Sequence, residues 1–502
     1  MNNIMNNFSY NRRIELIIFT VLSLIVAFYL DQNFMPAEDA SILFRYSENL
    51  ADTGIISYNL NGKPTEGATD FLWMIILSIF YFFGVNIYFS AIFINLLSLY
   101  YSISLIRKYY SLSNIHFYVL LFLHFSITYT YAALLGFSVL FVQLLLVLVV
   151  INFFKKNIFN TLLFSFIGCL VRPDFILFII IPNLFLFFKN FNLKNIILYS
   201  LFFLLGLIYF YGRYKYFDLL LPLPFYIKNK WDWFNNIEWG RQIIILSPIL
   251  LSLFFVNIRK IFRTNILILV SITIFATLYY TNQILYQNVG YRFYFYFTLF
   301  CVFVLYEFKV DSIKTEDVSK FIIIIIALFS ITINLFQNFN SFKFFSKKED
   351  LYLFSKHLKN INNNFKVNLA TTEAGLIPYY SKIDTVDLFG LNSKRFAKKP
   401  ADGSLFLEQN FDMIIINSDV TGKNCDSLKE AFDKSKNLNI KNANRNDDWS
   451  KFTIKLLYGI DFLKYDSYFL SYPTNIFINK YSKAYKELSK YLEKINHLKC
   501  YY

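Results

Sequence analysis

Residues 136–156 read Gly136-Phe-Ser-Val-Leu-Phe-Val-Gln-Leu-Leu-Leu-Val-Leu-Val-Val-Ile-Asn-Phe-Phe-Lys-Lys156. The run is apolar over about the length that a helix needs to cross a bilayer, and it ends on two lysines. We therefore expect a transmembrane helix at 136–153. Similar stretches predict further spans, about eleven in all, at 14–30, 87–106, 115–132, 157–171, 174–188, 195–212, 242–257, 265–281, 290–307 and 320–337.

The composition agrees with an α-helical polytopic membrane protein. Of the 502 residues, 56% are hydrophobic and 21% are aromatic, and the mean hydropathy of +0.42 is too high for a soluble globule of this length. The net charge is +15, but no basic run is interleaved with the stacking residues that a nucleic-acid site needs, so we exclude nucleic acid as a partner. The first apolar stretch lacks a small-residue cleavage site, which favours a retained anchor over a signal peptide.

Lysine and arginine predict the orientation. The segment 71–84 is apolar but short, so it is either a short span or a helix at the membrane interface. If it does not cross, the basic clusters between spans all fall on the cytoplasmic side, as the positive-inside rule requires. The charges thus favour about eleven spans, with the N-terminus inside and the C-terminal tail on the outer, extracytoplasmic side. These clusters are Arg12 and Arg13; Arg107 and Lys108; Lys155 and Lys156; Lys189 and Lys194; Arg259, Lys260 and Arg263; and Lys309, Lys314 and Lys320.

The chain changes character near residue 338. Residues 1–337 hold the apolar spans, whereas residues 338–502 are rich in Lys, Asn and Ser. Short β-like runs between helical stretches predict a small soluble mixed α/β domain on the outer face. The β-like runs are 366–370, 385–388 and 412–416, and helical spacing returns at 481–498.

The four cysteines divide between the two parts of the chain. Cys169 and Cys301 fall inside apolar runs, while Cys425 and Cys500 lie in the polar tail. An oxidising exterior would permit a disulfide between the last two, and the sequence does not decide that pairing.

An acidic pair lies in the first outer loop, residues 31–70. Pro36 precedes Glu38 and Asp39, and apolar residues on one helical face follow them. We expect a helix that lies on the bilayer surface with the acidic pair at its start. Acidic residues at a helix N-terminus are also ordinary caps, so local sequence leaves both interpretations open. The apolar face consists of Ile42, Leu43, Tyr46 and Leu50.

The same orientation places Arg172, Arg213 and Arg292 on the outer side, together with the loop that begins at Arg213. Charges near membrane depth are costly and commonly mark a pathway or a site. Sugar transfer from a phosphate-linked donor requires a base for the acceptor hydroxyl and cations that balance the departing phosphate. A glycoside hydrolase instead needs two carboxylates. One carboxylate with several arginines therefore favours a transferase.

Several motifs make a more specific pattern. The first loop contains Glu38-Asp-Ala-Ser-Ile-Leu-Phe-Arg-Tyr-Ser-Glu-Asn-Leu50, then Tyr58-Asn59, then Thr65-Glu-Gly-Ala-Thr-Asp-Phe-Leu-Trp73. This loop resembles the signature of the bacterial membrane arabinofuranosyltransferases and their relatives in the GT-C superfamily. Other segments resemble motifs of the same family in the same order: Val171-Arg-Pro-Asp174, Arg213-Tyr-Lys-Tyr-Phe-Asp-Leu-Leu-Leu-Pro-Leu-Pro-Phe-Tyr-Ile-Lys228, Glu373-Ala-Gly-Leu-Ile-Pro-Tyr-Tyr-Ser381 and Val386-Asp-Leu-Phe-Gly-Leu-Asn392.

Three departures from the family pattern bear on donor and acceptor identity more than on reaction class. The usual Asp-Asp pair is Glu38-Asp39 here, and Leu-Pro-Asn-Thr has become Leu221-Pro-Leu-Pro224. The family's Gly-Met-Glu-Thr segment is present only as Gly136-Phe137-Ser138, which removes a carboxylate.

The resemblance implies roles for individual residues. Asp39 would be the general base of an inverting transfer, with Glu38 as a second carboxylate; if a divalent cation such as Mg²⁺ or Mn²⁺ is needed, these two would bind it. An arginine on an interfacial helix or at a span end also commonly anchors the helix to headgroups, and Glu66 beside Gly67 also suits a plain turn. The implied donor-phosphate ligands are Arg45, Arg172, Arg213, Lys228 and Arg292, and the implied substrate-orienting residues are Tyr58, Asn59 and Glu66.

The implied function is transfer of arabinofuranose or a similar sugar from a polyprenyl-phosphate donor to a cell-envelope glycan or glycolipid, on the outer face of the inner membrane. An alternative within the class is a polyprenyl-phosphate hexose or aminoarabinose transferase that acts on lipid A or protein. Outside the class, the alternatives are a lipid or glycan transporter or flippase and a structural assembly protein. A transporter is disfavoured because no pair of broken helices suggests inverted repeats.

Overall fold

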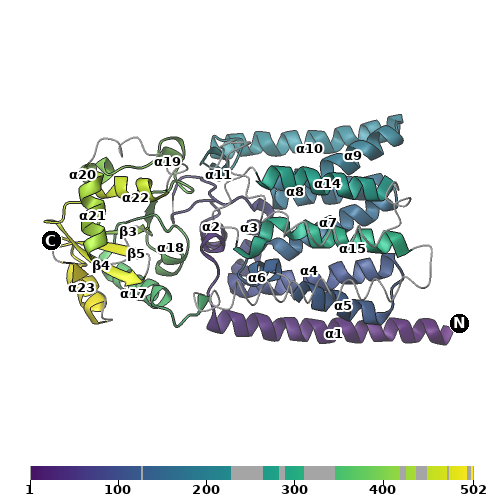
Figure 1. Cartoon of the computed structure of the whole chain (residues 1–502), viewed down its shortest axis with the longest axis horizontal. Coiled ribbons are helices and arrows are strands. Elements are labelled where there is room, and N and C mark those ends of the chain that lie inside the picture. Colours follow the sequence, from purple (N-terminus) through teal and green to yellow (C-terminus); the bar gives the residue numbers. More distant parts are fainter. Residues whose placement is uncertain are drawn as a thin grey trace.

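The computed structural model describes residues 2–60, 62–125, 128–227, 264–281, 289–309, 345–418, 425–436, 449–471, 474–494 and 499–500. Figure 1 shows a bundle of long helices side by side, with a domain that contains a β-sheet beyond one end of the bundle. We call this end the domain end and the opposite one the far end. The expected spans at 242–257 and 320–337, the domain boundary at 337/338 and Lys228 lie outside the described residues.

The spans expected within the described residues are helical, and two of them begin with a 3-10 turn. The stretch at 174–188 follows the turn that starts at Pro173, and the stretch at 290–307 begins with a turn in which Gly290 and Tyr291 have positive φ. In the stretch at 115–132, residues 126 and 127 lie outside the described residues. Four described helices are long and apolar enough to cross a membrane, which agrees with a membrane protein. The bundle contains α1 (Asn2–Asn33), α4 (Ile87–Tyr109), α5 (Asn114–Phe125), α6 (Thr128–Leu134), α7 (Val139–Phe154), α8 (Ile158–Val171), η1 (Pro173–Phe175), α9 (Ile176–Lys189), α10 (Leu193–Phe217), α14 (Thr264–Thr281), η2 (Val289–Tyr294) and α15 (Phe295–Lys309).

The far end of the bundle is closed by buried polar pairs. Arg107, at the end of α4, pairs with Glu15 of α1 at 2.9 Å. The Tyr110 hydroxyl donates to Glu307 Oε1 at 2.9 Å, and Asn265 Nδ2 donates to Glu307 Oε2 at 3.2 Å. These contacts place the end of α4, the end of α15 and the start of α14 at the same level, as the predicted orientation requires.

The short apolar helix α3 (Phe71–Phe82) does not cross the bundle. The chain leaves α1 at the domain end, where Lys347 N donates to Asn33 O at 2.9 Å. It begins α4 at the same end, because the Tyr88 hydroxyl donates to Leu134 O at 3.0 Å and the Tyr88 ring contacts Phe44 of α2. Since α1 and α4 both reach the far end with their other termini, the chain between them returns to the level that it left. The charge pattern predicted this result.

Helix α2 (Glu38–Thr53) follows the acidic pair as expected, but its position differs from the expected one. It does not lie exposed on the bilayer: residues 40–49 are all buried, with Phe44 and Tyr46 at 0% exposure. Figure 1 shows α2 between the bundle and the C-terminal domain, beside α3 and α18 (Leu376–Ser381). An amphipathic pattern shows that the apolar face of a helix is buried, but it does not show what buries it. In this structure, protein packs against both faces of α2.

The C-terminal domain is built on a six-stranded mixed sheet of order β2-β1-β3-β5-β4-β6. The first three strands are parallel and the other pairings are antiparallel. The β-like runs predicted from sequence correspond to β1 (Leu369–Thr371), β2 (Thr385–Asp387) and β3 (Met413–Asn417), which are followed by β4 (Tyr465–Ser471), β5 (Thr474–Asn479) and β6 (Lys499–Cys500).

Helices cover both faces of this sheet. Alternate residues of β3 enter different cores, because successive side chains of a strand point to opposite faces. Met413 and Ile415 pack in one core, and Ile414 and Ile416 pack in the other. Besides α18, the domain contains α17 (Asp350–Phe365), α19 (Lys394–Lys398), α20 (Ser404–Glu408), α21 (Cys425–Ser435), α22 (Trp449–Leu457) and α23 (Tyr485–Lys494).

The cysteines follow the division expected from sequence. Cys425 is disulfide-bonded, whereas Cys169 and Cys301 in the bundle are free thiols. Disulfides persist mainly in oxidising compartments, so this bond is consistent with a domain outside the cytoplasm.

Candidate functional site

The centre of the site is an ion pair between the first outer loop and the bundle. Asp39 lies in the first turn of α2, and its Oδ2 is 2.9 Å from Arg292 Nη2. Arg292 is presented by η2, where Gly290 (φ 60°) and Tyr291 (φ 53°) turn the chain through the left-handed region. Its guanidinium packs 4.0 Å from the centre of the Phe137 ring. The buried arginine is thus fixed in position by a carboxylate on one side and an aromatic face on another.

A second arginine lies next to this pair. Arg172 follows α8 and forms a bidentate pair with Asp174, with Nε donating at 3.0 Å and Nη2 at 2.6 Å. The Tyr280 hydroxyl of α14 donates to the same Asp174 at 2.7 Å. Phe293 joins the two arginines, because its ring centre is 4.9 Å from the Arg172 guanidinium and 4.8 Å from that of Arg292. Two positive groups therefore share one aromatic neighbour at the domain end of the bundle.

Asp70 completes this group of charges. It precedes α3, and its charge acts on both Arg172 and Arg292. Ser138 Oγ donates to Asp70 Oδ2 at 2.5 Å. Ser138 stands at the position where the arabinofuranosyltransferase motif that the sequence resembles has a carboxylate. In this chain its hydroxyl donates to the Asp70 carboxylate, which comes from another part of the chain.

Sequence reasoning assigned no role to Asp70 or Asp174, although both lie in the quoted motifs. For Asp174 a local signal existed, because a carboxylate two residues after an arginine can reach the guanidinium through a tight turn. For Asp70 the sequence gave only its place before an apolar helix.

Glu38 points away from Asp39, into the C-terminal domain. Its oxygens accept hydrogen bonds from the backbone N–H groups of Gly375 and Leu376, the latter at 2.8 Å. Its negative charge also acts on the nearby Glu373 carboxyl. Burial, opposed by the two N–H donors, raises the pKa of Glu38 to about 7. Glu38 therefore connects the first outer loop to the domain.

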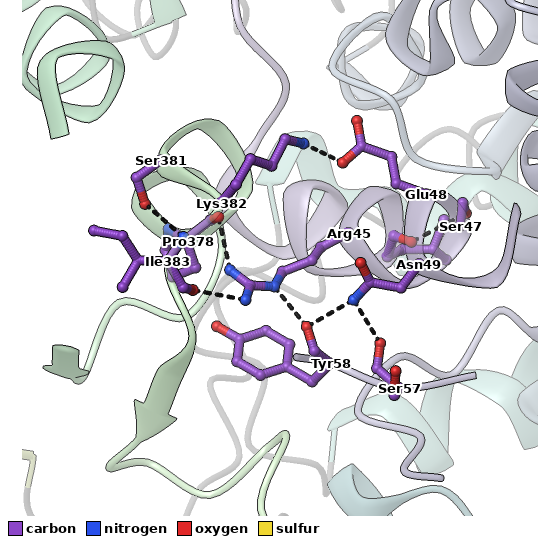
Figure 2. Close-up of polar contacts among 11 residues, drawn as sticks. Arg45, Ser47, Glu48, Asn49, Ser57, Tyr58, Pro378, Ser381, Lys382 and Ile383 are labelled. Carbon is purple, nitrogen blue, oxygen red and sulfur yellow. Dashed lines mark hydrogen bonds and ion pairs between the residues drawn. The ribbon is translucent and has the colours of Figure 1, made fainter. Parts of the chain in front are cut away.

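Arg45 has a different position from the phosphate-binding one that the sequence suggested. Figure 2 shows its guanidinium enclosed by oxygen acceptors of the protein itself. Nε donates to Tyr58 O at 2.6 Å, Nη1 to Pro378 O at 2.7 Å, and Nη2 to Ile383 O at 2.7 Å and Asn59 Oδ1 at 2.9 Å. Because these acceptors use the nitrogens that a phosphate would need, we assign Arg45 to the junction between the loop and the domain.

Tyr58 and Asn59, which were expected to orient substrate, belong to the same junction. The Tyr58 hydroxyl donates to Ala374 O at 2.6 Å. Asn59 pairs with the backbone of Thr385 in both directions, with its Nδ2 donating to the carbonyl and its Oδ1 accepting from the N–H, each at 3.0 Å. The Asn59 amide therefore makes, at the edge of β2, the two hydrogen bonds that the backbone of a neighbouring strand would make.

Glu66 and Arg213 form a separate buried ion pair. Arg213 Nε also donates to Leu220 O at 3.0 Å, and Nη1 donates to the Tyr209 hydroxyl at 3.2 Å. Glu66 O accepts from Leu223 N at 3.0 Å, at the start of α11 (Leu223–Ile227). The pair fixes the first loop to the end of α10, which differs from the expected contacts with donor phosphate and sugar. Lys228, the remaining expected ligand, lies outside the described residues.

The carboxylates expected to bind a divalent cation do not fit one well. Glu38 is occupied by backbone N–H groups, and Asp39 faces a guanidinium. The described residues contain no group of three or more His, Cys, Asp or Glu side chains that could hold a metal ion. A requirement for a cation stays a prediction.

Similarity to known proteins agrees with this architecture. Residues 354–469 match a family described as a domain of unknown function, DUF8728, and no curated protein matches the sequence. The structure of ArnT from Cupriavidus metallidurans bound to undecaprenyl phosphate has a TM-score of 0.54 and 10% identity, and the match covers 81% of this chain and 93% of ArnT. ArnT in the apo state gives a TM-score of 0.54 and 12% identity, with 82% and 94% covered.

These likenesses confirm the predicted fold class. The chain has a GT-C-type helical membrane domain followed by a small mixed α/β domain. At such low identity the likeness concerns the fold alone, so the specific resemblance to arabinofuranosyltransferases stays a prediction.

Proposed function

We propose that this protein is a glycosyltransferase that takes its sugar from a polyprenyl-phosphate donor. The observation that carries the proposal is the ion pair between Asp39 and Arg292, with Arg172 beside it, at the domain end of the bundle. A carboxylate for a hydroxyl proton and two buried guanidinium groups for a phosphate are the groups that this chemistry needs.

The fold supports the same conclusion. The ArnT structure with the same fold was solved with undecaprenyl phosphate bound, and a lipid phosphate is the kind of ligand that two adjacent arginines recognise. In this chain the arginines stand at the ends of apolar helices, where a polyprenyl tail would lie in the membrane and its phosphate would reach the guanidinium groups.

The reaction requires one displacement. The acceptor hydroxyl gives its proton to Asp39 and attacks the anomeric carbon from the face opposite the phosphate. A glycosidic bond forms as the bond between the anomeric carbon and the phosphate oxygen breaks, and the electron pair of that bond stays on the phosphate. The product is inverted at the anomeric carbon. Arg172 and Arg292 balance the charge that grows on the departing polyprenyl phosphate.

The surrounding carboxylates hold these arginines in place. Asp174 orients Arg172 through two hydrogen bonds, and Asp70 lies within electrostatic reach of both guanidinium groups. Side chains that are fixed before substrate arrives lose little entropy on binding, which favours a preorganised phosphate site.

We further propose that the reaction takes place on the outer face of the cytoplasmic membrane. The basic clusters at the far end and the disulfide at Cys425 both support this orientation. The acceptor would then be a cell-envelope glycan or glycolipid. Arabinofuranose or a similar sugar is our first candidate for the donor group, on the strength of the first-loop and tail motifs.

The test is to incubate purified protein with a panel of polyprenyl-phosphate sugars and envelope glycans, and to identify products by mass spectrometry. We expect a new glycosidic bond with the wild-type protein and none with Asp39→Asn. Transport of a lipid or glycan across vesicles without a new bond would instead support the transporter alternative. Full activity of Asp39→Asn would contradict the assigned base.

A further inference from the structure

A fully buried asparagine of α4 bonds to the chain where α7 begins. Asn95 lies about two turns into its helix, and its Nδ2 donates to Ala91 O at 2.8 Å and to Phe137 O at 2.9 Å. Its Oδ1 accepts from Leu140 N at 3.1 Å and from Phe141 N at 3.3 Å. Both halves of the amide therefore have partners, as a buried polar group in an apolar helix requires.

The bonds to Leu140 and Phe141 are those that an N-cap residue usually makes. The first N–H groups of a helix have no partner within the helix, and a serine that precedes the helix commonly accepts from them. Ser138 stands at this position before α7, but its hydroxyl donates to Asp70 Oδ2 at 2.5 Å. Asn95 thus caps α7 from a neighbouring helix, which leaves the Ser138 hydroxyl available to hold Asp70.

The turn at 135–138, which joins α6 to α7, packs closely against α2. Gly136 has a φ of 101°, and a Cβ there would lie 2.6 Å from the Phe44 ring and 3.4 Å from the Ala40 Cβ. Ala40 follows Asp39 directly in the first turn of α2. The turn therefore lies next to the helical turn that carries the proposed base, at a distance that only glycine permits.

The same turn supports one of the two arginines. Phe137, whose carbonyl accepts from Asn95, places its ring centre 4.0 Å from the Arg292 guanidinium. Because an aromatic face attracts a cation, a shift of the Phe137 backbone would move the surface on which this guanidinium rests. The position of Arg292 thus depends on how firmly the turn is held.

We propose that Asn95 is a positioning residue for the transferase site. By capping α7 and holding the Phe137 carbonyl, it fixes the turn at 135–138. Through this turn it acts on Arg292 and Asp70. The proposal rests on the proposed function, since it assigns Asn95 to the same phosphate-binding group.

Replacing Asn95 by Leu tests this role, because leucine has the same branched shape and suits a helix but forms none of the hydrogen bonds. We expect the affinity for undecaprenyl phosphate, measured by native mass spectrometry, to fall by about tenfold. Asn183→Leu is the matched control: Asn183 in α9 donates to the carbonyl four residues earlier, Ile179 O, at 2.8 Å. The control should keep wild-type affinity. Wild-type affinity in Asn95→Leu, or an equal loss in the control, overturns the proposal.

Threonine provides a second variant in case Asn95→Leu does not fold. A threonine hydroxyl in a helix commonly donates to the carbonyl four residues earlier, here Ala91 O. With its one proton used there, it has none for Phe137 O. We expect Asn95→Thr to lose affinity for undecaprenyl phosphate in the same direction, and wild-type affinity in this variant would equally overturn the role.

Hydrogen exchange gives a readout that is independent of sugar transfer. We expect the backbone amides of 139–141 and of 289–294, which carries Arg292, to exchange faster in Asn95→Leu than in wild type. Both segments should keep wild-type rates in Asn183→Leu. A change confined to 139–141 would make Asn95 a helix cap alone and would overturn its assigned action on Arg292. If wild-type protein forms no glycoside but both segments respond, the proposed function fails while the positioning role stands.

Discussion

The Asp39 carboxylate and the Arg292 guanidinium, separated by 253 positions in the chain, form a 2.9 Å ion pair at the domain end of the bundle. The pair joins the loop after the first span to the start of a late span, so the site exists only when the bundle is assembled. It also places the proposed base directly beside a cation that the proposed donor phosphate would need.

Replacing Asp39 by Asn should remove the base and preserve the fold. We expect turnover to fall by about 10²- to 10⁴-fold, the usual range for a lost general base, while binding of undecaprenyl phosphate is retained. Initial rates and native mass spectrometry would measure the two effects. Asp218→Asn is the matched control, because Asp218 has an 85% exposed side chain and asparagine tolerates its left-handed backbone.

Replacing Arg172 by Lys should weaken donor binding. Lysine keeps the charge but cannot form the bidentate pair with Asp174, so the cation would no longer be held in place. We expect the affinity for undecaprenyl phosphate to fall by about 10- to 100-fold. Equal affinity in Arg172→Lys and wild type would show that the phosphate binds elsewhere.

Replacing Arg45 by Lys should destabilise the junction and spare the phosphate site. Arg45 donates to two carbonyl groups of the domain, and lysine lacks the geometry to reach all of its acceptors. We expect a loss of about 3 kcal/mol in the free energy of unfolding, seen as a lower Tm and faster proteolysis between bundle and domain. Arg395→Lys, at an exposed surface pair, should change stability by less than about 1 kcal/mol. An unchanged Tm in Arg45→Lys would contradict the assigned role.

Replacing Gly375 by Ala should separate the domain from α2. The added methyl group would meet Glu38 O at 2.0 Å, so one backbone must move. We expect a destabilisation of about 1–3 kcal/mol together with a lower transfer rate. Gly212→Ala is the control, since nothing lies within 4 Å of the added atom there and alanine suits the helix better.

Stability should fall as pH rises through neutrality. Burial raises the pKa of Glu38 from 4.5 to about 7 in the folded protein, so folding favours the protonated form. The associated stabilisation is fully present below about pH 4.5 and is lost as pH rises through about 7. Thermal unfolding between pH 5 and pH 8, at roughly half-unit steps, should show this decline in wild type and a flatter profile in Glu38→Gln. The same slope in both proteins would argue against the assignment.

The sequence predicted the parts of the molecule that depend on local pattern. Apolar length located the described spans, and the position of lysines and arginines showed that 71–84 returns to the side it left. The family motifs identified Asp39, Arg172 and Arg292, which the structure brings together. The short apolar run in 412–416 identified the central strand β3.

The partners of buried polar residues could not be predicted in this way. Arg45 suits a phosphate ligand in sequence, yet two of its four acceptors are carbonyl groups more than 330 positions later in the chain. Glu38 resembles a metal ligand beside Asp39, yet backbone N–H groups of another domain occupy it. In both cases a tertiary contact satisfies the side chain, and no local spacing reports such a contact. The burial of α2 could not be predicted for the same reason, because part of the protein that covers it lies far away in the sequence.

The hydrogen bond from Arg45 to Ile383 has a consequence for how the protein is made, because the two residues are separated by 338 positions. A ribosome that adds about 5–20 residues per second reaches Ile383 roughly 20–70 seconds after Arg45. Throughout that interval the loop lacks these partners. A nascent or truncated chain therefore carries an incomplete junction, and the candidate site is complete only after the C-terminal domain has been synthesised and folded.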